Sequence, residues 1–131
     1  MGMGLKMKEQ TYTIKINQSF DCQTYDNKSG RIHHASLSLD NCIPWQDQTW
    51  SLFDLSKETD LDERFQLISG QYLYQQVFGD YPLDLNMSLH KQIRIISENE
   101  DINRIPWQLL AKDGDFLVHH NYSIMLSHQA E

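Results

Sequence analysis

The chain has 131 residues, 40% of them hydrophobic and 22% charged, which is typical of one folded domain and unlike a disordered segment. Its formal net charge is −7 and it has no cluster of Lys and Arg of the kind that binds a polyanion, so we expect no nucleic-acid partner. No apolar run could span a bilayer and no secretion signal follows the first lysines, so we expect no membrane association. With only two cysteines, Cys22 and Cys42, and no such signal, the sequence favours free thiols and a cytoplasmic location.

The first part of the chain alternates between apolar and polar residues in two runs. Residues 1–10 are expected to be a tail or a remnant of cloning. Over residues 11–22 the apolar side chains fall on even positions, which predicts a half-buried strand, because the side chains of a strand point alternately to its two faces. Residues 26–30 (Asp-Asn-Lys-Ser-Gly) have turn chemistry, and alternation resumes over residues 34–39. The two runs predict an antiparallel β-hairpin.

Residues 41–57 carry much apolar and aromatic surface without a clear period. We expect this segment to cover the hairpin, so that residues 11–58 form a β-hairpin with an aromatic covering segment. Its Trp45, Trp50 and Phe53 have two interpretations. They pack over the hairpin, which we favour because large aromatic side chains mostly serve cores, or they form a patch that binds a partner.

A helix is predicted over residues 61–78. Its apolar residues repeat at helical spacing in one stripe, formed by Leu61, Phe65, Ile68 and Tyr72. Asp60 is expected to cap the first turn, and Glu63 three residues later completes a capping box. Gly79 is a natural residue to end this helix. Gly70 inside it is unfavourable by about 1 kcal/mol relative to Ala.

A nearly continuous apolar run follows the helix at residues 93–96. Such a run predicts a strand of a parallel sheet with both faces covered. The acidic residues 98–101 then predict a solvated loop, and Pro106 leads a short helical turn at residues 107–110.

The last part of the chain is predicted to hold a turn and two strands. Asp113-Gly114 has the composition of a tight turn. Residues 116–118 and 122–126 are expected to be strands on either side of His119-His120-Asn121. In extended backbone His119 and His120 would point to opposite faces and could not easily serve one ion.

The segment from Lys91 to Ser127 combines these features in a particular order. A hydrophobic strand, a polar loop, a small helix, a turn and a second strand follow one another. The strand is Ile93-Arg94-Ile95-Ile96, and after the loop the helix is entered through Ile105-Pro106-Trp107-Gln108-Leu109-Leu110. The turn is Asp113-Gly114-Asp115-Phe116-Leu117, and the second strand is Tyr122-Ser123-Ile124-Met125-Leu126-Ser127. This order resembles the opening of CHAT domains, the caspase-like domains often found beside tetratricopeptide repeats. The resemblance implies an α/β fold, the first half of a caspase-like three-layer sandwich preceded by the antiparallel β-hairpin. Residues 59–131 would be the start of the caspase-like domain, with its helix, first core strand, small helix and strand pair.

The function that this resemblance implies is that of a CHAT-type cysteine peptidase, which is a hydrolase, or of a caspase-like effector. In this family the catalytic His and Cys lie downstream of the strand that matches residues 122–127. The residues of this chain that match the family are scaffold, namely Ile93, Ile95 and Ile96 of the first core strand and Pro106, Trp107 and Leu110 of the small helix. The chain is therefore expected to be scaffold and not an enzyme by itself. The alternative is a non-enzymatic protein–protein interaction module that binds through its sheet edge or through residues 45–53.

No set of chemically active side chains in the sequence has the spacing of a site. A Cys–His dyad needs a thiolate beside a base, whereas Cys22 falls on the apolar side of its strand and is expected to be buried. The two cysteines and the His33-His34 pair lack the close spacing of zinc ligands. Residues 98–101 lack the ligand offsets and the Gly of a calcium loop. We therefore assign no catalytic, cofactor-binding or metal-binding residue, and we expect no cofactor.

The expected partners follow from the incomplete sheet. The first strands of a larger sheet would leave an edge and apolar surface without a partner, and such an edge is a template for association. We therefore expect the chain to self-associate, or to bind the remaining part of the caspase-like domain or another protein chain.

Overall fold

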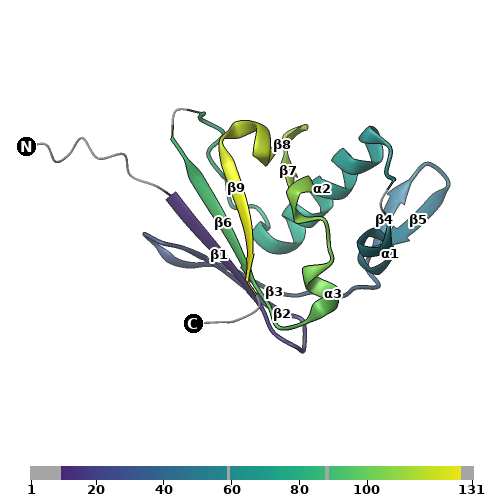
Figure 1. Ribbon diagram of the computed structural model, residues 1–131, viewed down its shortest axis with the longest axis horizontal. Helices are drawn as coiled ribbons and strands as arrows, with labels where there is room; N and C mark the ends of the chain where they lie inside the picture. Colours follow the sequence, from purple (N-terminus) through teal and green to yellow (C-terminus); the bar gives the residue numbers. More distant parts are fainter. Residues whose placement is uncertain (1–9, 59, 88, 128–131) are drawn as a thin grey trace, which may run out of the picture.

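The computed structural model describes residues 10–58, 60–87 and 89–127, which form a mixed α/β fold (Figure 1). The strands, in chain order, are β1 (Gln10–Ile16), β2 (Asp21–Asp26), β3 (Gly30–Ser36), β4 (Cys42–Trp45), β5 (Gln48–Ser51), β6 (Lys91–Ile96), β7 (Ala111–Lys112), β8 (Asp115–Phe116) and β9 (Tyr122–Ser127). The helices are α1 (Leu52–Lys57), α2 (Glu63–Phe78) and α3 (Glu100–Asn103), with the 3-10 helices η2 (Trp107–Leu109) and η3 (Leu117–His120).

Five strands make one mixed sheet with the order β3-β2-β1-β6-β9. Antiparallel pairing joins β1 to β2 and β2 to β3, whereas β6 is parallel to both β1 and β9. The three α-helices lie on one side of this sheet (Figure 1). Because β1 pairs with β6, the segments predicted as residues 11–58 and 59–131 share one sheet and one core.

The run of residues 11–22 is not one strand, as the alternation predicted, but two strands joined by a turn. The Asn17 side-chain oxygen accepts from the N–H groups of Ser19 and Asp21, at 2.9 and 3.0 Å, and so fixes the turn. Ile16 and Cys22 are paired across it and therefore face the same side of the sheet. The apolar residues thus stay on even-numbered positions through the turn, so the sequence pattern does not show where one strand ends and the next begins. The turn predicted at residues 26–30 is confirmed, so the hairpin is the second half of a three-stranded meander.

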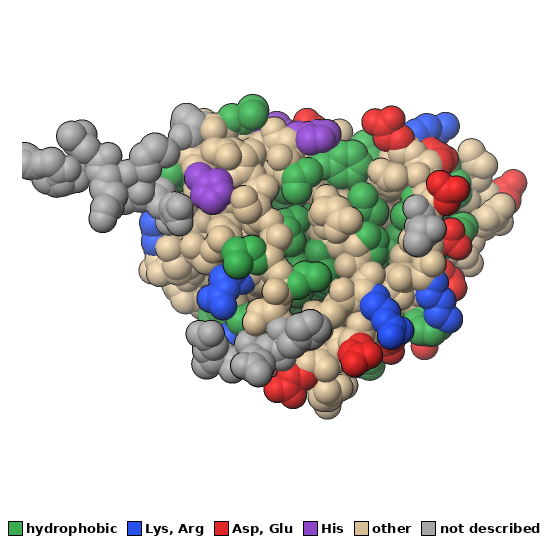
Figure 2. Space-filling view, viewed as in Figure 1, with side chains coloured by type: hydrophobic (Ala, Val, Ile, Leu, Met, Phe, Trp, Pro, Cys, Tyr) green, Lys and Arg blue, Asp and Glu red, His purple; other side chains and the backbone are tan. Residues whose placement is uncertain are grey.

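Residues 42–57 form the β4–β5 hairpin and the short helix α1. The prediction that their aromatics pack over the first hairpin is wrong for Trp45 and Trp50, which contact Phe65 of α2 with ring centroids 5.6 and 4.9 Å away. Both tryptophans are partly buried against the core. Phe53 lines a hollow beside the first hairpin, as predicted. Acidic side chains gather on the surface over this part of the fold (Figure 2).

Helix α2 packs its apolar stripe on the sheet. Its N-cap is Asp62, which accepts from the Arg64 N–H at 2.9 Å, and not Asp60 as predicted. The helix ends at Gly79 (φ 60°) as predicted. Gly70 of α2 lies against the backbone of η2, since a Cβ built there would lie 1.7 Å from the Leu109 carbonyl oxygen. The helix thus contains a glycine because η2 passes directly over it.

The crossover from β6 to β9 contains more helix than predicted. The acidic loop predicted at residues 98–101 instead runs into α3, which Asn99 caps by accepting from the Asp101 N–H. The helical turn after Pro106 is confirmed as η2, and Asp113 and Gly114 form the predicted turn with φ angles of 54° and 84°. The predicted strand at residues 116–118 is wrong beyond Phe116, because the chain turns there into η3.

Strand β6 is an interior strand and is parallel to both neighbours, as predicted from its apolar run. Ile93 and Ile95 are fully buried on the helix side. The expectation that both faces are covered is only half met: Ile96 on the other face is 5% exposed, whereas Gln92 and Arg94 there are partly exposed. The described helices therefore leave a polar face of the sheet open.

Two buried polar groups tie the loops to the sheet. The carboxylate of Asp26 accepts from Gln10 Nε2 at 2.6 Å, from the Lys28 N–H at 2.8 Å and from the Tyr81 hydroxyl at 3.0 Å. Burial raises the pKa of Asp26, but these hydrogen bonds outweigh it and leave the pKa below its ordinary 3.8. The charged form is therefore the one that the fold stabilises.

Lys91 is the second such group and is fully buried at the start of β6. Its Nζ donates to the carbonyl oxygens of Asp84, at 3.0 Å, and Asn86, and lies 4.5 Å from the centre of the Tyr122 ring. Burial lowers the pKa of this ammonium group. The loop before β6 is thus held by one buried cation.

Candidate functional site

The open face of the sheet is a regular grid of polar side chains. Residues paired across strands lie side by side, so each register position makes one row across this face. Two rows cross all five strands, and the first consists of Arg31, Tyr25, Thr13, Arg94 and Met125, from β3 to β9. The next row consists of His34, Gln23, Lys15, Ile96 and Ser127. This face is the first candidate site.

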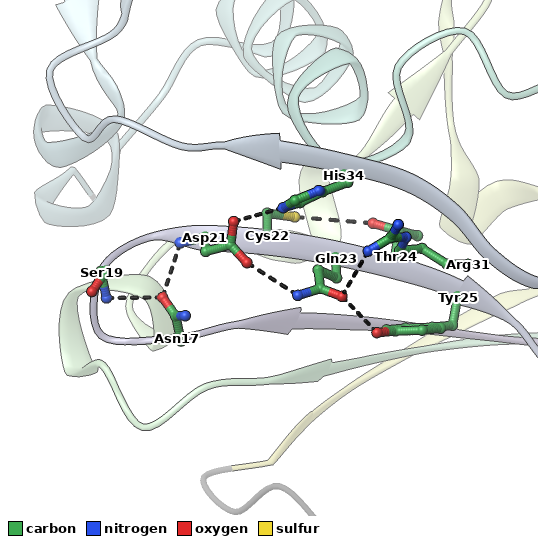
Figure 3. A network of polar contacts seen from close by, with 9 residues as sticks. All are labelled: Asn17, Ser19, Asp21, Cys22, Gln23, Thr24, Tyr25, Arg31 and His34. Carbon is green, nitrogen blue, oxygen red and sulfur yellow. Dashed lines mark hydrogen bonds and ion pairs between the residues drawn. The ribbon is translucent and has the colours of Figure 1, made fainter.

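A hydrogen-bond network orders the β2 and β3 side of this face (Figure 3). His34 Nε2 lies 2.7 Å from Asp21 Oδ1, and Gln23 Nε2 donates to Asp21 Oδ2 at 3.1 Å. The other end of the Gln23 amide, Oε1, accepts from the Tyr25 hydroxyl at 2.7 Å and from Arg31 Nη1 at 3.4 Å. The hydrogen bonds from His34 and Gln23 lower the pKa of Asp21. The network holds the Tyr25 ring and the Gln23 amide in defined orientations.

A hollow of about 380 Å³ lies beside this network. Its lining includes Lys15, Asn17 and Tyr25 on the meander side and Ile96 and Ser97 at the end of β6. The parallel strands β1 and β6 both end here, and the strand order reverses between them, since the chain runs from β1 outward to β3 and returns to β6. Open α/β sheets bind ligands beyond the carboxyl ends of strands at such a reversal.

The outer edge of β9 is the second candidate site. The Lys91 N–H donates to the Asn121 carbonyl at 3.0 Å, and the Ser97 N–H donates to the Ser127 carbonyl at 3.1 Å. In a parallel strand, the backbone N–H and C=O groups of successive residues point alternately towards one neighbouring strand and towards the opposite side. The odd-numbered residues of β9 therefore bond to β6, and the backbone groups of Tyr122, Ile124 and Leu126 point outward. No strand within the described residues pairs with that edge.

The cysteines do not lie in a nucleophilic setting. Cys22 is fully buried, burial raises the pKa of its thiol to about 11, and its polar neighbour is the Thr24 hydroxyl at 4.0 Å. Cys42 is exposed, and its Sγ donates to the Asp40 carbonyl at 3.5 Å. The hydrogen-bond partner of each thiol is thus an oxygen and not a histidine base.

Four of the six histidines form two sequence-adjacent pairs, His33-His34 and His119-His120, and the side chains of the two pairs are oriented differently. His33 and His34 point to opposite faces as expected, since His33 Nε2 lies 3.2 Å from the Gln76 carbonyl of α2 and His34 reaches the open face. For His119 and His120 the same expectation is wrong. Because η3 replaces the predicted strand, both reach the Asp115 carboxylate, at 3.1 and 3.0 Å.

Within the described residues, no group of three or more His, Cys, Asp and Glu side chains is arranged to hold a metal ion. Of the acidic residues predicted as a loop, Glu100 and Asp101 lie in the first turn of α3, where Arg104 approaches them at 3.6 and 3.8 Å. None of the helices in the described part combines the length and the apolarity needed to cross a membrane.

Comparison with protein-family models found no match to this chain, and comparisons with curated proteins and with solved structures found no significant match either.

The strand of the second candidate site was predicted at residues 122–126, whereas the cations of the open face were not predicted as a site. Lys15 and Arg94 were passed over because they are 79 positions apart in the numbering and belong to no charge cluster. One signal could have found them. Polar side chains fall on odd-numbered positions of β1 and on even-numbered positions of β6, and each set lies on one face of its strand. Pairing of these two strands was needed to place them on the same face.

Proposed function

We propose that this chain is a protein–protein assembly module that receives a further β-strand at the outer edge of β9. The observation that supports the proposal is that the residue types of β9 do not block pairing with a further strand. Strand β9 reads Tyr-Ser-Ile-Met-Leu-Ser, with no charge and no proline, although exposed edge strands usually carry such residues to block pairing. Met125 and Leu126 are each 48% exposed on it. An added strand would satisfy the outward backbone groups and cover this apolar surface.

The added strand has two sources in this proposal. In the CHAT-type form it comes from the remaining part of one caspase-like domain, which would also bring the catalytic His and Cys of a cysteine peptidase. In the interaction-module form it comes from another protein chain, including a second copy. The polar open face favours the second form, because the other outer layer of a three-layer sandwich needs apolar surface beneath it.

The test uses self-association, which the second copy makes measurable without a known partner. We expect sedimentation equilibrium at micromolar concentration to show a reversible dimer or larger species. Hydrogen exchange followed by NMR should show amides of Tyr122, Ile124 and Leu126 becoming protected as the concentration rises. The amides of Ser123 and Met125 should be protected at every concentration, because they bond to β6.

One substitution separates the edge from the rest of the strand. Leu126→Pro removes an outward N–H and leaves the bonds to β6 in place, so it should abolish association without unfolding the chain. Leu126→Ala is the matched control, since it removes the exposed side chain but keeps the N–H, and association should be weakened but retained. A stable monomer whose Ile124 and Leu126 amides exchange freely at all concentrations would overturn the second copy as the source of the added strand.

The CHAT-type form has its own test. Sequencing the native reading frame beyond Glu131 should reveal a strand followed by His-Gly and, later, a strand followed by Cys. A longer protein expressed with those segments should cleave peptides and should show protected β9 edge amides as a monomer. A frame without these two segments would overturn this form alone.

A further inference from the structure

The open face of the sheet concentrates positive charge on an acidic protein. Among the described residues, three cations stand on it, Lys15, Arg31 and Arg94. The carboxylates beside them are Asp21, which contacts His34, and Glu98 just after the end of β6. The chain as a whole has a net charge of −7. This face therefore has the opposite sign to the rest of the molecule and would attract an anion.

Two of these cations have no counter-ion. Elsewhere Arg104 and Lys112 lie within 4 Å of carboxylates. Neither Lys15 nor Arg94 has an ion pair with any acidic side chain of the described residues; the only described partner of Lys15 is the Tyr25 ring, whose centre is 5.4 Å from Nζ. Two adjacent, uncompensated cations match a ligand with two negative charges.

The register of β1 and β6 brings the two cations together. Thr13 is paired with Arg94, and Lys15 with Ile96, so Lys15 and Arg94 are diagonal neighbours on the same face. Both line one hollow of about 260 Å³, together with Thr13, Tyr25 and Ile96. Three of these residues, Lys15, Tyr25 and Ile96, also line the larger hollow at the ends of β1 and β6. The two hollows together form what we term the β1–β6 groove. Its smaller hollow is lined by both cations and by no carboxylate, whereas Asp21 and Glu98 line the larger one.

The groove is organised before any ligand arrives. The Tyr25 ring is held by its hydroxyl, which donates to Gln23, whose amide is in turn held by Asp21 (Figure 3). Ile96 is 5% exposed and forms an apolar floor. A ligand would therefore meet a fixed ring and a fixed apolar surface beside two cations, and binding would lose little side-chain entropy.

We infer that the β1–β6 groove binds a small phosphomonoester that carries a planar ring. The phosphate dianion is contacted by Lys15 and by the Arg94 guanidinium, with the Thr13 hydroxyl as a further donor. Arginine recognises phosphate with two parallel N–H bonds, and a dianion balances both cations at once. The planar ring lies against Tyr25 and Ile96. This inference does not depend on the β9 edge, because Lys15 and Arg94 are on β1 and β6.

The test uses AMP as the probe and chemical-shift mapping by NMR as the readout. AMP should bind saturably and shift the amides of Thr13, Lys15, Tyr25 and Arg94. Adenosine, which lacks the phosphate, and inorganic phosphate, which lacks the ring, should each bind about tenfold more weakly or worse. Raising the salt concentration should weaken AMP binding. Binding of adenosine as tight as that of AMP would overturn the inference.

Variants separate the groove from general charge. Arg94→Gln and Lys15→Gln should each weaken AMP binding about tenfold, because each removes one charged donor. Arg104→Gln is the matched control, since it removes an exposed cation from α3, and binding should be unchanged. Thermal melts check that each variant is folded. Equal binding by Arg94→Gln and Arg104→Gln would overturn the inference.

Two other outcomes would also be decisive. A short single-stranded RNA that binds through the same residues and far more tightly than AMP would mean a polymer site and would refute a small ligand. The absence of any saturable shift at millimolar AMP would refute the site. Leu126→Pro should leave AMP binding unchanged and Arg94→Gln should leave association unchanged, so that this inference and the assembly proposal fail separately.

Discussion

Replacing Gly70 by Ala tests the close packing of η2 on α2. In an isolated helix this change is stabilising by about 1 kcal/mol, because Gly is the poorer helix former. In this protein the added Cβ would lie 1.7 Å from the Leu109 carbonyl oxygen, 2.7 Å from its carbon and 3.1 Å from Ala111 Cβ. The first two contacts are with backbone, so no side-chain rotation relieves them. Either α2 or η2 must move.

The movement is costly because η2 is anchored on both sides. Trp107 is 1% exposed and its indole N–H donates to the Ile102 carbonyl at 2.8 Å, while Leu110 is fully buried. Overpacking in such a setting is unfavourable by about 1–3 kcal/mol, and backbone contacts this short favour the upper end. After subtraction of the helix-propensity gain, we expect Gly70→Ala to lower the free energy of unfolding by about 2 kcal/mol. The melting temperature should fall by roughly 5–10 °C.

The assay is urea denaturation followed by far-UV circular dichroism and tryptophan fluorescence, with linear extrapolation to water. Ser69→Ala is the matched control on the same helix. The Ser69 hydroxyl is buried and makes no hydrogen bond within the described residues, so its loss should be neutral or slightly stabilising. If Gly70→Ala were instead stabilising by about 1 kcal/mol, the packing of η2 on α2 described above would be refuted.

Four further predictions concern Asp26, the two cysteines and Lys91. The pKa of Asp26 is lowered in the folded state, so its carboxylate stabilises the fold above pH 3.8, and this contribution is lost as the pH falls through the lowered value. Asp26→Asn should therefore lower the free energy of unfolding by about 1.5–3 kcal/mol at neutral pH and should flatten the acid limb of a stability–pH curve. Ellman's reagent at pH 8 should titrate one thiol, that of Cys42, in the folded chain and two in denaturant, because Cys22 is buried with a pKa of about 11. Replacing both cysteines by Ala should leave any peptidase turnover of a longer form nearly intact, and loss of turnover in a folded variant would contradict this. Lys91→Met should lower the free energy of unfolding by about 2–3 kcal/mol and should speed hydrogen exchange in residues 84–87, because the carbonyl groups of Asp84 and Asn86 lose their buried donor.

The elements that local sequence determined are those whose signal lies within a few residues. The apolar run of β6, the glycine that ends α2 and the Asp113-Gly114 turn were all placed correctly from neighbours along the chain. In each case the residue types themselves favour the observed backbone, by β-branching, by tolerance of positive φ or by helical spacing of apolar side chains. The general α/β character of the fold follows from the same signals.

Tertiary structure decided where those elements lie and what they expose. The turn at residues 17–20 was invisible, because pairing of Ile16 with Cys22 preserves the alternation across it. The strand at residues 116–118 gave way to η3, where Leu117 is fully buried and its N–H donates to the Leu110 carbonyl at 2.9 Å. In both cases a contact between segments outweighed a short local pattern.

Both candidate sites belong to this second class. The outward-facing groups of β9 exist only because β6 takes the odd-numbered residues, and Lys15 meets Arg94 only because β1 pairs with β6 in one register. A shift of that register by one residue would turn every side chain of a strand to the other face. Local sequence sets which side chains alternate, but the pairing of distant strands decides which of them meet, because the hydrogen bonds that fix a register join residues that share no local signal.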